Sequence, residues 1–231
     1  MSGAPTLDLV DVDVVRSGVA VLSSVTLRSE ARTIAVIGEN GSGKSTLARM
    51  LSGLVPHTRG TARVLGLDPR RDVAALRRRV ATVFSNPDTQ IVMPTVAEDV
   101  AFSLRALRLP RTEVDARVDA ALTRFGLAAL RDAAAHELSS GQKQLLAVAG
   151  AFIRDPEVVI ADEPTSFLDA RHARIVADHL LADGGHRTLV VTHDLALAQR
   201  CEVVVLCAGG RVVQAGDPAT VVNAYETSLR C

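Results

Sequence analysis

The 231-residue sequence lacks several features that would assign it to other classes of protein. Lysine plus arginine and aspartate plus glutamate each number 26, so the net charge is zero and nothing electrostatic favours a nucleic acid as the main partner. The three cysteines do not have the spacing of a metal site, which is typical of free thiols in a reducing compartment. Lysine is nearly absent, because only Lys44 and Lys143 occur.

Segments that would cross or enter a membrane are also missing from the sequence. No run of about 18 consecutive apolar residues occurs, so we predict no transmembrane helix. The start of the chain has neither a basic n-region nor an apolar h-region, so we do not expect a secretory signal peptide. Apolar residues nevertheless make up 48% of the chain, which predicts a folded protein with a buried core.

The sequence is organised around residues 38–45, which read Gly-Glu-Asn-Gly-Ser-Gly-Lys-Ser and fit the Walker A pattern G-x-x-x-x-G-K-[ST]. An apolar run at 34–37 predicts a strand before the motif, and 46–51 predicts a helix after it. Glycines allow backbone N–H groups to approach phosphate, and the helix N-terminus adds positive charge. We therefore expect a nucleoside triphosphate to bind Gly38, Glu39, Asn40, Gly41, Ser42, Gly43, Lys44, Ser45 and Thr46.

Short apolar segments alternate with helical sequence along the rest of the chain, which predicts an α/β protein with a parallel sheet. The pattern predicts strands at 80–84, 158–161, 188–192 and 203–206, hairpins at 7–28 and 209–216, a short strand at 62–64 and a basic helix at 72–79. Residues 95–152 have a helical pattern, in which Thr112 is expected to open one helix.

The strand predicted at 158–161 ends in two acids, Asp162 and Glu163. At the carboxyl end of a strand beside a P-loop, the first acid can hold Mg²⁺ together with the Ser45 hydroxyl. The second can polarise a water molecule for attack on the γ-phosphate. We therefore expect an ATP and Mg²⁺ site in which Glu163 is the catalytic base.

Residues 138–142 read Leu-Ser-Ser-Gly-Gln, and Ser139 is predicted to cap a helix whose N–H groups form a second anion seat. A lone P-loop needs no second seat, whereas a composite site closed by a partner chain does. Here the chain resembles the ATP-binding-cassette (ABC) ATPases, whose signature is Leu-Ser-Gly-Gly-Gln. The resemblance implies that ATP lies between one P-loop and the signature of a second ATPase subunit, identical or related, through Ser139, Ser140, Gly141 and Gln142.

The resemblance covers essentially the whole chain and implies a P-loop NTPase core with an antiparallel β subdomain and a helical signature subdomain. It implies one domain over 1–231, with the core and β subdomain at 1–94 and 153–231 and the helical subdomain at 95–152. Asp169 ends a D-loop that reads Ser-Phe-Leu-Asp, and His193 is the switch histidine of Thr-His-Asp. The catalytic residues are then Glu163, His193 and Lys44.

Three positions depart from the family pattern. Ser140 replaces the first glycine of the signature but keeps its N–H. Arg16, or its neighbour Val15, stands where the family has an aromatic residue against adenine, and the Arg16 guanidinium either stacks on the base or is solvated. Ser85 stands where the family has the Q-loop glutamine, which senses Mg²⁺ and the membrane partner.

Gln90 is the residue that could replace the Q-loop glutamine, and it is our third candidate magnesium contact beside Ser45 and Asp162. We expect Gln90 to serve mainly a docking groove for a partner. Asp88, Glu98 and Asp99 would make that groove acidic, unless they only cap and solvate the start of a helix.

Residues 86–102 are similar to the ATPases of energy-coupling-factor importers, with Asn-Pro-Asp-x-Gln followed by Val-x-Glu-Asp-x-Ala-Phe. The likeness implies a transmembrane T subunit, a substrate-binding S subunit and peripheral attachment to the cytoplasmic face of the cell membrane. Ile-Val-Met-Pro at 91–94 most resembles the biotin-transporter ATPase, with cobalt or nickel uptake second. A soluble ABC ATPase of assembly or repair and a P-loop small-molecule kinase remain alternatives, although a kinase has no use for residues 138–142.

Overall fold

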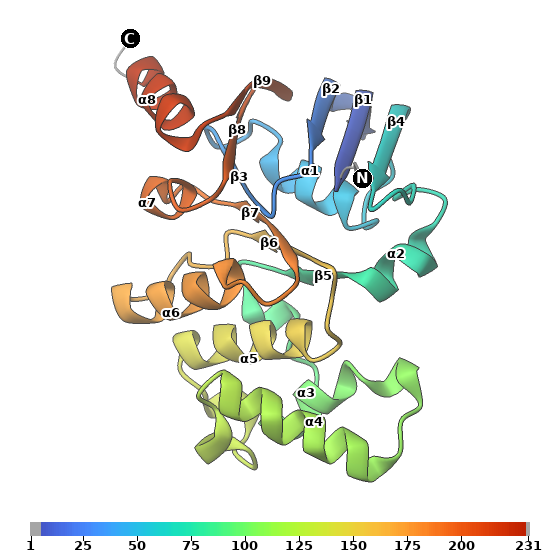
Figure 1. The fold of residues 1–231 in the computed structure, drawn as a ribbon, viewed down its shortest axis with the longest axis vertical. Coiled ribbons are helices and arrows are strands. Elements are labelled where there is room, and N and C mark those ends of the chain that lie inside the picture. Colours follow the sequence, from blue (N-terminus) through green and yellow to red (C-terminus); the bar gives the residue numbers. More distant parts are fainter. Residues whose placement is uncertain (1–5, 230–231) are drawn as a thin grey trace.

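The centre of the fold is a six-stranded sheet (Figure 1), seen in a computed structural model that describes residues 6–229. The strand order is β5-β6-β7-β3-β8-β9, and neighbours from β5 to β8 are parallel whereas β9 is antiparallel to β8. The strands are β3 (Thr33–Ile37), β5 (Val80–Val83), β6 (Val158–Asp162), β7 (Arg187–Val191), β8 (Val203–Ala208) and β9 (Arg211–Gly216). The predicted α/β class is confirmed, with one antiparallel strand added at the edge.

A second, antiparallel sheet of three strands has the order β2-β1-β4 and lies at the upper right of Figure 1. Its strands are β1 (Leu7–Arg16), β2 (Val19–Ser29) and β4 (Arg59–Val64). Ser17 and Gly18 form the turn between β1 and β2 with φ of 49° and 79°, which are positive values that suit a tight hairpin. The predicted hairpin and its turn are therefore confirmed.

Helices cover the six-stranded sheet and extend below it in Figure 1. They are α1 (Lys44–Leu51), α2 (Val73–Arg79), α3 (Val96–Phe102), α4 (Arg111–Arg124), α5 (Ser140–Phe152), α6 (Ala170–Leu181), α7 (Leu195–Ala198) and α8 (Pro218–Ser228). The prediction that Thr112 opens a helix is wrong by one residue. Helix α4 begins at Arg111 after Pro110, which has no N–H and fixes the extended entry to the helix.

Both faces of the sheet are buried at strands β3, β6, β7 and β8, because alternate residues of these strands enter two different apolar cores, whereas the edge strand β9 is partly exposed. On β3, Ile34 and Val36 pack toward α1 and the antiparallel sheet, whereas Ala35 and Ile37 pack toward the helices of the other face. Strands covered on both faces are apolar throughout, which is why the sequence showed them as short uninterrupted runs. Helices α3, α4 and α5 share the second core with the sheet. The proposed subdomain boundaries at 95 and 152 stay a prediction.

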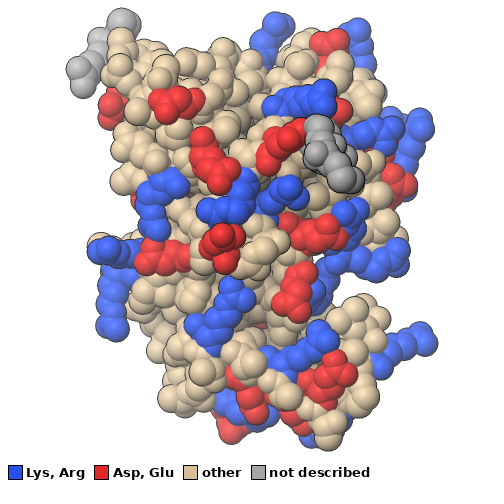
Figure 2. Space-filling model, viewed as in Figure 1, with Lys and Arg blue, Asp and Glu red and all other residues tan. Residues whose placement is uncertain are grey.

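Charged side chains of both signs are interspersed over the face in Figure 2, with no field of one sign across it. Within residues 6–229, no helix is both long enough and apolar enough to cross a membrane.

Candidate nucleotide-binding site

The loop between β3 and α1 has a backbone that needs glycine. Gly38, Gly41 and Gly43 have φ of 140°, 81° and 97°. A Cβ on Gly38 would lie 2.1 Å from the carbonyl oxygen of Cys207, and a Cβ on Gly43 would lie 2.6 Å from Leu22 Cδ2. Because β8 and β2 leave no room for a side chain, these two positions of the loop require glycine.

Lys44 folds back across this loop. Its Nζ donates hydrogen bonds to the carbonyl oxygens of Gly38 at 2.7 Å and Glu39 at 2.8 Å, and the residue is buried. Helix α1 begins at Lys44 with no side-chain cap, so its first N–H groups are left for an external anion. Ser42 Oγ is buried and has no hydrogen-bond partner among residues 6–229. Lys44 and the start of α1, whose first turn contains Thr46, thus lie together where the sequence predicted phosphate.

Ser45 and Asp162 meet although 117 positions separate them in the sequence. The Ser45 hydroxyl donates to Asp162 Oδ1 at 2.8 Å. Burial raises the pKa of Asp162, while the Ser45 hydrogen bond and the positive charges of Arg49 and Lys44 act in the opposite direction. A hydroxyl and a buried carboxylate in contact are oxygen ligands of the kind that Mg²⁺ prefers, and a cation would relieve the cost of burying the charge.

Glu163 follows the end of β6 and is held by His193. Glu163 Oε2 accepts hydrogen bonds from His193 Nδ1 at 2.7 Å and from the Ser166 hydroxyl at 3.2 Å. The Glu163 backbone has φ of 53°, a strained value for a residue with a Cβ, and its N–H donates to the Val191 carbonyl at 2.9 Å. Glu163 Oε1 receives no hydrogen bond from the described part of the chain. One oxygen is therefore fixed and the other is available to a water molecule.

Glu163, His193 and the first part of the P-loop border an open cavity of about 570 Å³, which we call the nucleotide cavity. Its lining comprises Gly38, Glu39, Asn40, Ser85, Glu163, Ser166, Phe167, His193 and Tyr225. Ser166, Phe167 and Tyr225 were not predicted as site residues. Tyr225 comes from α8, and burial together with the negative Glu39 raises its pKa. No local motif marks Tyr225, because only the packing of α8 against β8 and β9 brings it to the cavity.

Gln90 does not line this cavity, and both ends of its amide bond backbone groups, so its predicted magnesium contact has no support in the structure. Its Oε1 accepts from the Phe84 N–H at 2.7 Å and its Nε2 donates to the Thr82 carbonyl at 3.0 Å. Both ends of the amide are thus used by backbone at the end of β5. Gln90 borders a different cavity, between β5, α3 and α5, which we call the side cavity.

The expected acidic groove is not found either. Asp88 pairs with Lys143 Nζ at 2.8 Å, and Glu98 completes a capping box with Thr95 at the start of α3. Asp99 is buried and accepts from the N–H groups of Val92 and Met93. These acids are satisfied locally, as the alternative interpretation proposed. The charged residues lining the side cavity are Arg77, Asp99 and Arg154.

The signature residues lie apart from the cavity at Glu163, and none of them lines it. Ser139 caps α5, because its hydroxyl accepts from the Gln142 N–H at 3.3 Å and Gln142 Oε1 accepts from the Ser139 N–H at 2.9 Å. Ser140 begins α5 and is exposed, whereas Gly141 is buried. The predicted helix cap is confirmed, and within one chain the start of α5 lies apart from the P-loop.

The last two predicted nucleotide contacts lie on other elements. Arg16 is exposed at the end of β1, opposite Val19 in the hairpin, and has no side-chain hydrogen bond to the described residues. Asp169 caps α6, where the N–H and the ring of His172 lower the pKa of the Asp169 carboxyl by donating hydrogen bonds to it.

Comparison with known proteins now fixes the family. The family described as ABC transporter matches residues 23–166, which contain the P-loop, the signature and both acids after β6. The chain belongs to the ABC transporter ATPase family. It is therefore an ATP-binding subunit of an ABC transporter and an ATPase. This excludes the kinase alternative.

Relatives of this ABC ATPase match it over most of their lengths. A putative ABC transporter ATP-binding protein of Deinococcus radiodurans is 44% identical over 209 residues, covering 90% of this chain and 92% of the relative. An energy-coupling factor transporter ATP-binding protein of Lacticaseibacillus paracasei is 41% identical, covering 82% and 70%. A biotin transport ATP-binding protein of Rhizobium etli is 39% identical, covering 86% and 87%.

A solved structure shows the same fold. It is cbiO1 of Clostridium perfringens, described as part of the ABC transporter complex cbiONQ. The TM-score is 0.86 at 30% sequence identity, and the match covers 98% of this chain and 94% of that chain. The P-loop NTPase fold expected from the sequence is thus confirmed.

Proposed function

We propose that this ABC ATPase energises an energy-coupling-factor importer for a vitamin or a transition metal ion, with biotin as the first substrate class and cobalt or nickel as the second. The relatives named for energy-coupling-factor and biotin transport support this, as does the stretch at 86–102. In this proposal the chain associates peripherally with the cytoplasmic face of the cell membrane, bound to a T subunit that works with an S subunit.

The observation that carries the proposal is the separation of the P-loop from the signature at the start of α5. Glu163, His193 and the P-loop share one cavity, while Ser139 and Gly141 lie outside it. A second ATPase subunit, identical or related, would supply its signature to the γ-phosphate held here, and this chain would do the same in return. Closure around two ATP molecules then gives a motion that can be passed to a membrane partner.

Within one half of that site, the role of each side chain follows from its contacts. Lys44 already lies along the loop, so its charge would need only a small shift to reach the β- and γ-phosphates. Mg²⁺, held by Ser45 and Asp162, would neutralise charge that develops on the phosphate oxygens. Glu163 Oε1 would accept a proton from the attacking water, while His193 holds Oε2 in place.

We place the membrane partner's contact at the side cavity. It measures about 290 Å³ and lies at the junction of β5 with the helices α3 and α5. Its lining includes Gln90 and Phe102, an aromatic residue that is 42% exposed. An exposed aromatic beside a preformed cavity is suited to receive an apolar segment of a partner. Because the segment that follows β5 also contains Ser85 at the nucleotide cavity, movement at one cavity would be felt at the other.

The test is uptake into vesicles made from native membranes that carry the tagged chain. ATP-dependent accumulation of labelled biotin or of Co²⁺ is expected, and a matched preparation with Glu163→Gln should lose it. Purification of the tagged chain should recover two integral membrane subunits in fixed proportion. Normal uptake with Glu163→Gln, or recovery with soluble partners only, would favour the alternative of a soluble ABC ATPase in assembly or repair.

A further inference from the structure

His172, the third residue of α6, lies between the two segments that the composite site would present to a second subunit. Its ring covers Gly141 in the signature, because a Cβ on Gly141 would lie 2.4 Å from His172 Cγ and 2.5 Å from Cδ2. On its other side, Nδ1 lies 2.6 Å from Asp169 Oδ2 at the end of the D-loop. One side chain therefore contacts both functional segments of the same chain.

The contact with Gly141 explains why this helical position is glycine. Gly141 is in the first turn of α5 and is not among the residues with positive φ, so its backbone does not require glycine. Glycine is a poorer helix former than alanine, so its presence here has a local cost. The absence of a Cβ gives the room that the His172 ring occupies.

The contact with Asp169 fixes the ring itself. Asp169 Oδ1 accepts from the N–H groups of Arg171 and His172, which leaves Oδ2 for the ring. Because a carboxylate only accepts hydrogen bonds, His172 must carry a proton on Nδ1. The side chain of His172 is only 26% exposed, so this geometry is also held by packing.

We propose that His172 is a positioning residue that couples the D-loop to the signature, so that both segments meet the ATP held by a second subunit as one unit. The inference rests on the composite site of the proposed function. A displacement of about 1 Å at a reacting centre can cost roughly a hundredfold in rate, so independent movement of the two segments would be costly. Within the described residues His172 forms no hydrogen bond or ion pair with the P-loop of its own chain, so it should not affect the first binding of ATP.

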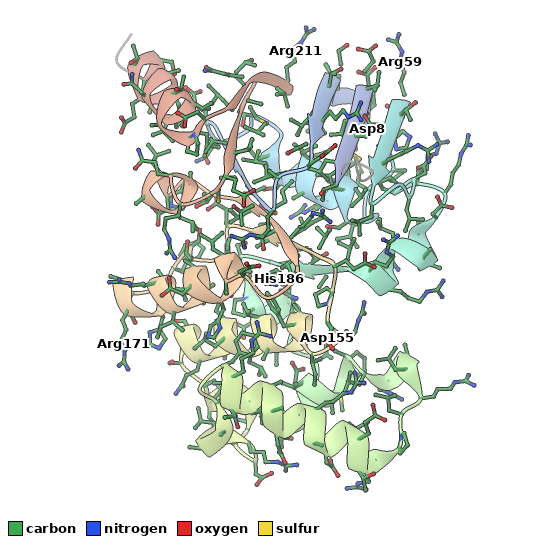
Figure 3. The ribbon with its side chains drawn as sticks, viewed as in Figure 1. Asp8, Arg59, Asp155, Arg171, His186 and Arg211 are labelled. Carbon is green, nitrogen blue, oxygen red and sulfur yellow. The ribbon has the colours of Figure 1, made fainter. Side chains whose placement is uncertain are left out.

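The experiment measures ATP-dependent dimerisation of the full-length chain by sedimentation, in a Glu163→Gln background that prevents turnover. Three substitutions are compared. His172→Ala removes both contacts, and His172→Asn keeps a donor at the place of Nδ1. Arg171→Ala is the matched control, because Arg171 projects from the outer end of α6 in Figure 3 and only its backbone N–H bonds Asp169. Binding of a fluorescent ATP analogue to dilute monomer is measured on the same samples.

We expect His172→Ala to weaken dimerisation by about tenfold or more, and His172→Asn to restore it to within about threefold. Arg171→Ala should match the parent, and binding of the nucleotide to monomer should be unchanged throughout. In the chain that keeps Glu163, His172→Ala should lower kcat for ATP hydrolysis, and His172→Asn should lower it less. A general packing defect would not be rescued by asparagine.

Dimerisation of His172→Ala at the parental level would overturn the inference. If the Glu163→Gln parent binds ATP but stays monomeric, the composite site of the proposed function is wrong, and the inference about His172 is wrong with it. This failure is recognised from the parent protein alone, before any His172 variant is compared. Unfolding temperature is recorded for each variant. Should His172→Ala fail to fold, His172→Leu replaces it, since leucine covers Gly141 but cannot donate to Asp169, and parental dimerisation would again refute the inference.

Discussion

Replacing Gln90 with alanine separates the two roles considered for this residue. The Gln90 amide bonds the backbone of Phe84 and Thr82, on the segment that leaves β5 for Ser85 and the nucleotide cavity. Gln90→Ala therefore frees that segment from its side-chain attachment. It removes no group from the cavity that contains Glu163.

The expected loss of stability follows from the two hydrogen bonds. Each contributes about 0.5–1.5 kcal/mol net, and a partly buried N–H of Phe84 left without a partner adds to the loss, so the sum is about 2 kcal/mol. For a chain of this size, each kcal/mol lowers the unfolding temperature by roughly 2–4 °C. We expect a decrease of about 4–8 °C.

Thermal unfolding by circular dichroism measures this change. Val92→Ala is the control, because Val92 is 60% exposed in the same segment and should change the free energy of unfolding by less than about 0.5 kcal/mol. ATP hydrolysis by the isolated Gln90→Ala chain should stay within a few-fold of wild type, while transport by the assembled complex falls much further. An unchanged unfolding temperature would refute the attachment, and equal losses of hydrolysis and transport would return Gln90 to the catalytic site.

Four further substitutions test the site and the fold. Lys44→Ala should abolish ATP binding and hydrolysis, because a full charge is lost from a buried site, and retained nucleotide affinity in a filter-binding assay would contradict this role. Glu163→Gln should leave ATP binding intact and lower phosphate release by on the order of 10²–10⁴, whereas near-normal hydrolysis would mean that another group is the base. Arg16→Ala should weaken ATP binding by about 1 kcal/mol if the guanidinium stacks on the base, and the chain should select only loosely among ATP, GTP and CTP. A strict preference for ATP that persists in the Arg16→Ala variant would show that another residue holds adenine. Burial and the positive Arg124 lower the pKa of His179 below 6.5, so the folded state takes up a proton less readily than the unfolded chain, and stability should fall as the pH drops below 6.5. His179→Leu should reduce that loss in urea unfolding at pH 5 and pH 8, and equal acid sensitivity in both proteins would show that other groups cause it.

Most of the parallel strands could be predicted because they are buried on both faces. Segments such as 158–161 and 189–191 are therefore short and apolar without interruption, and they stand out from helical sequence. The P-loop could also be predicted from the sequence, because its strand, glycines, Lys44 and helix follow one another along the chain. Its chemistry depends on local backbone geometry, which the spacing of the glycines determines.

Contacts between distant segments could not be predicted in the same way. Tyr225 and His172 reach functional groups only because α8 and α6 pack where they do. The acids at 88, 98 and 99 led to the wrong prediction of an acidic groove. The sequence cannot distinguish an acid that bonds nearby backbone from an acid that faces a partner. For Asp99, the hydrogen bonds that it accepts in the structure show that it is of the first kind.

The contacts within one chain suggest that ATP binds before the second subunit. The P-loop offers Lys44 and the uncapped N–H groups at the start of α1, which gain from a bound phosphate. The signature offers less to free ATP, because Ser139 and Gln142 already bond each other. A phosphate held on one chain would therefore be the ligand that recruits the other chain's signature. Because His193 already holds Glu163 Oε2, closure of the proposed dimer would be the step that remains before hydrolysis.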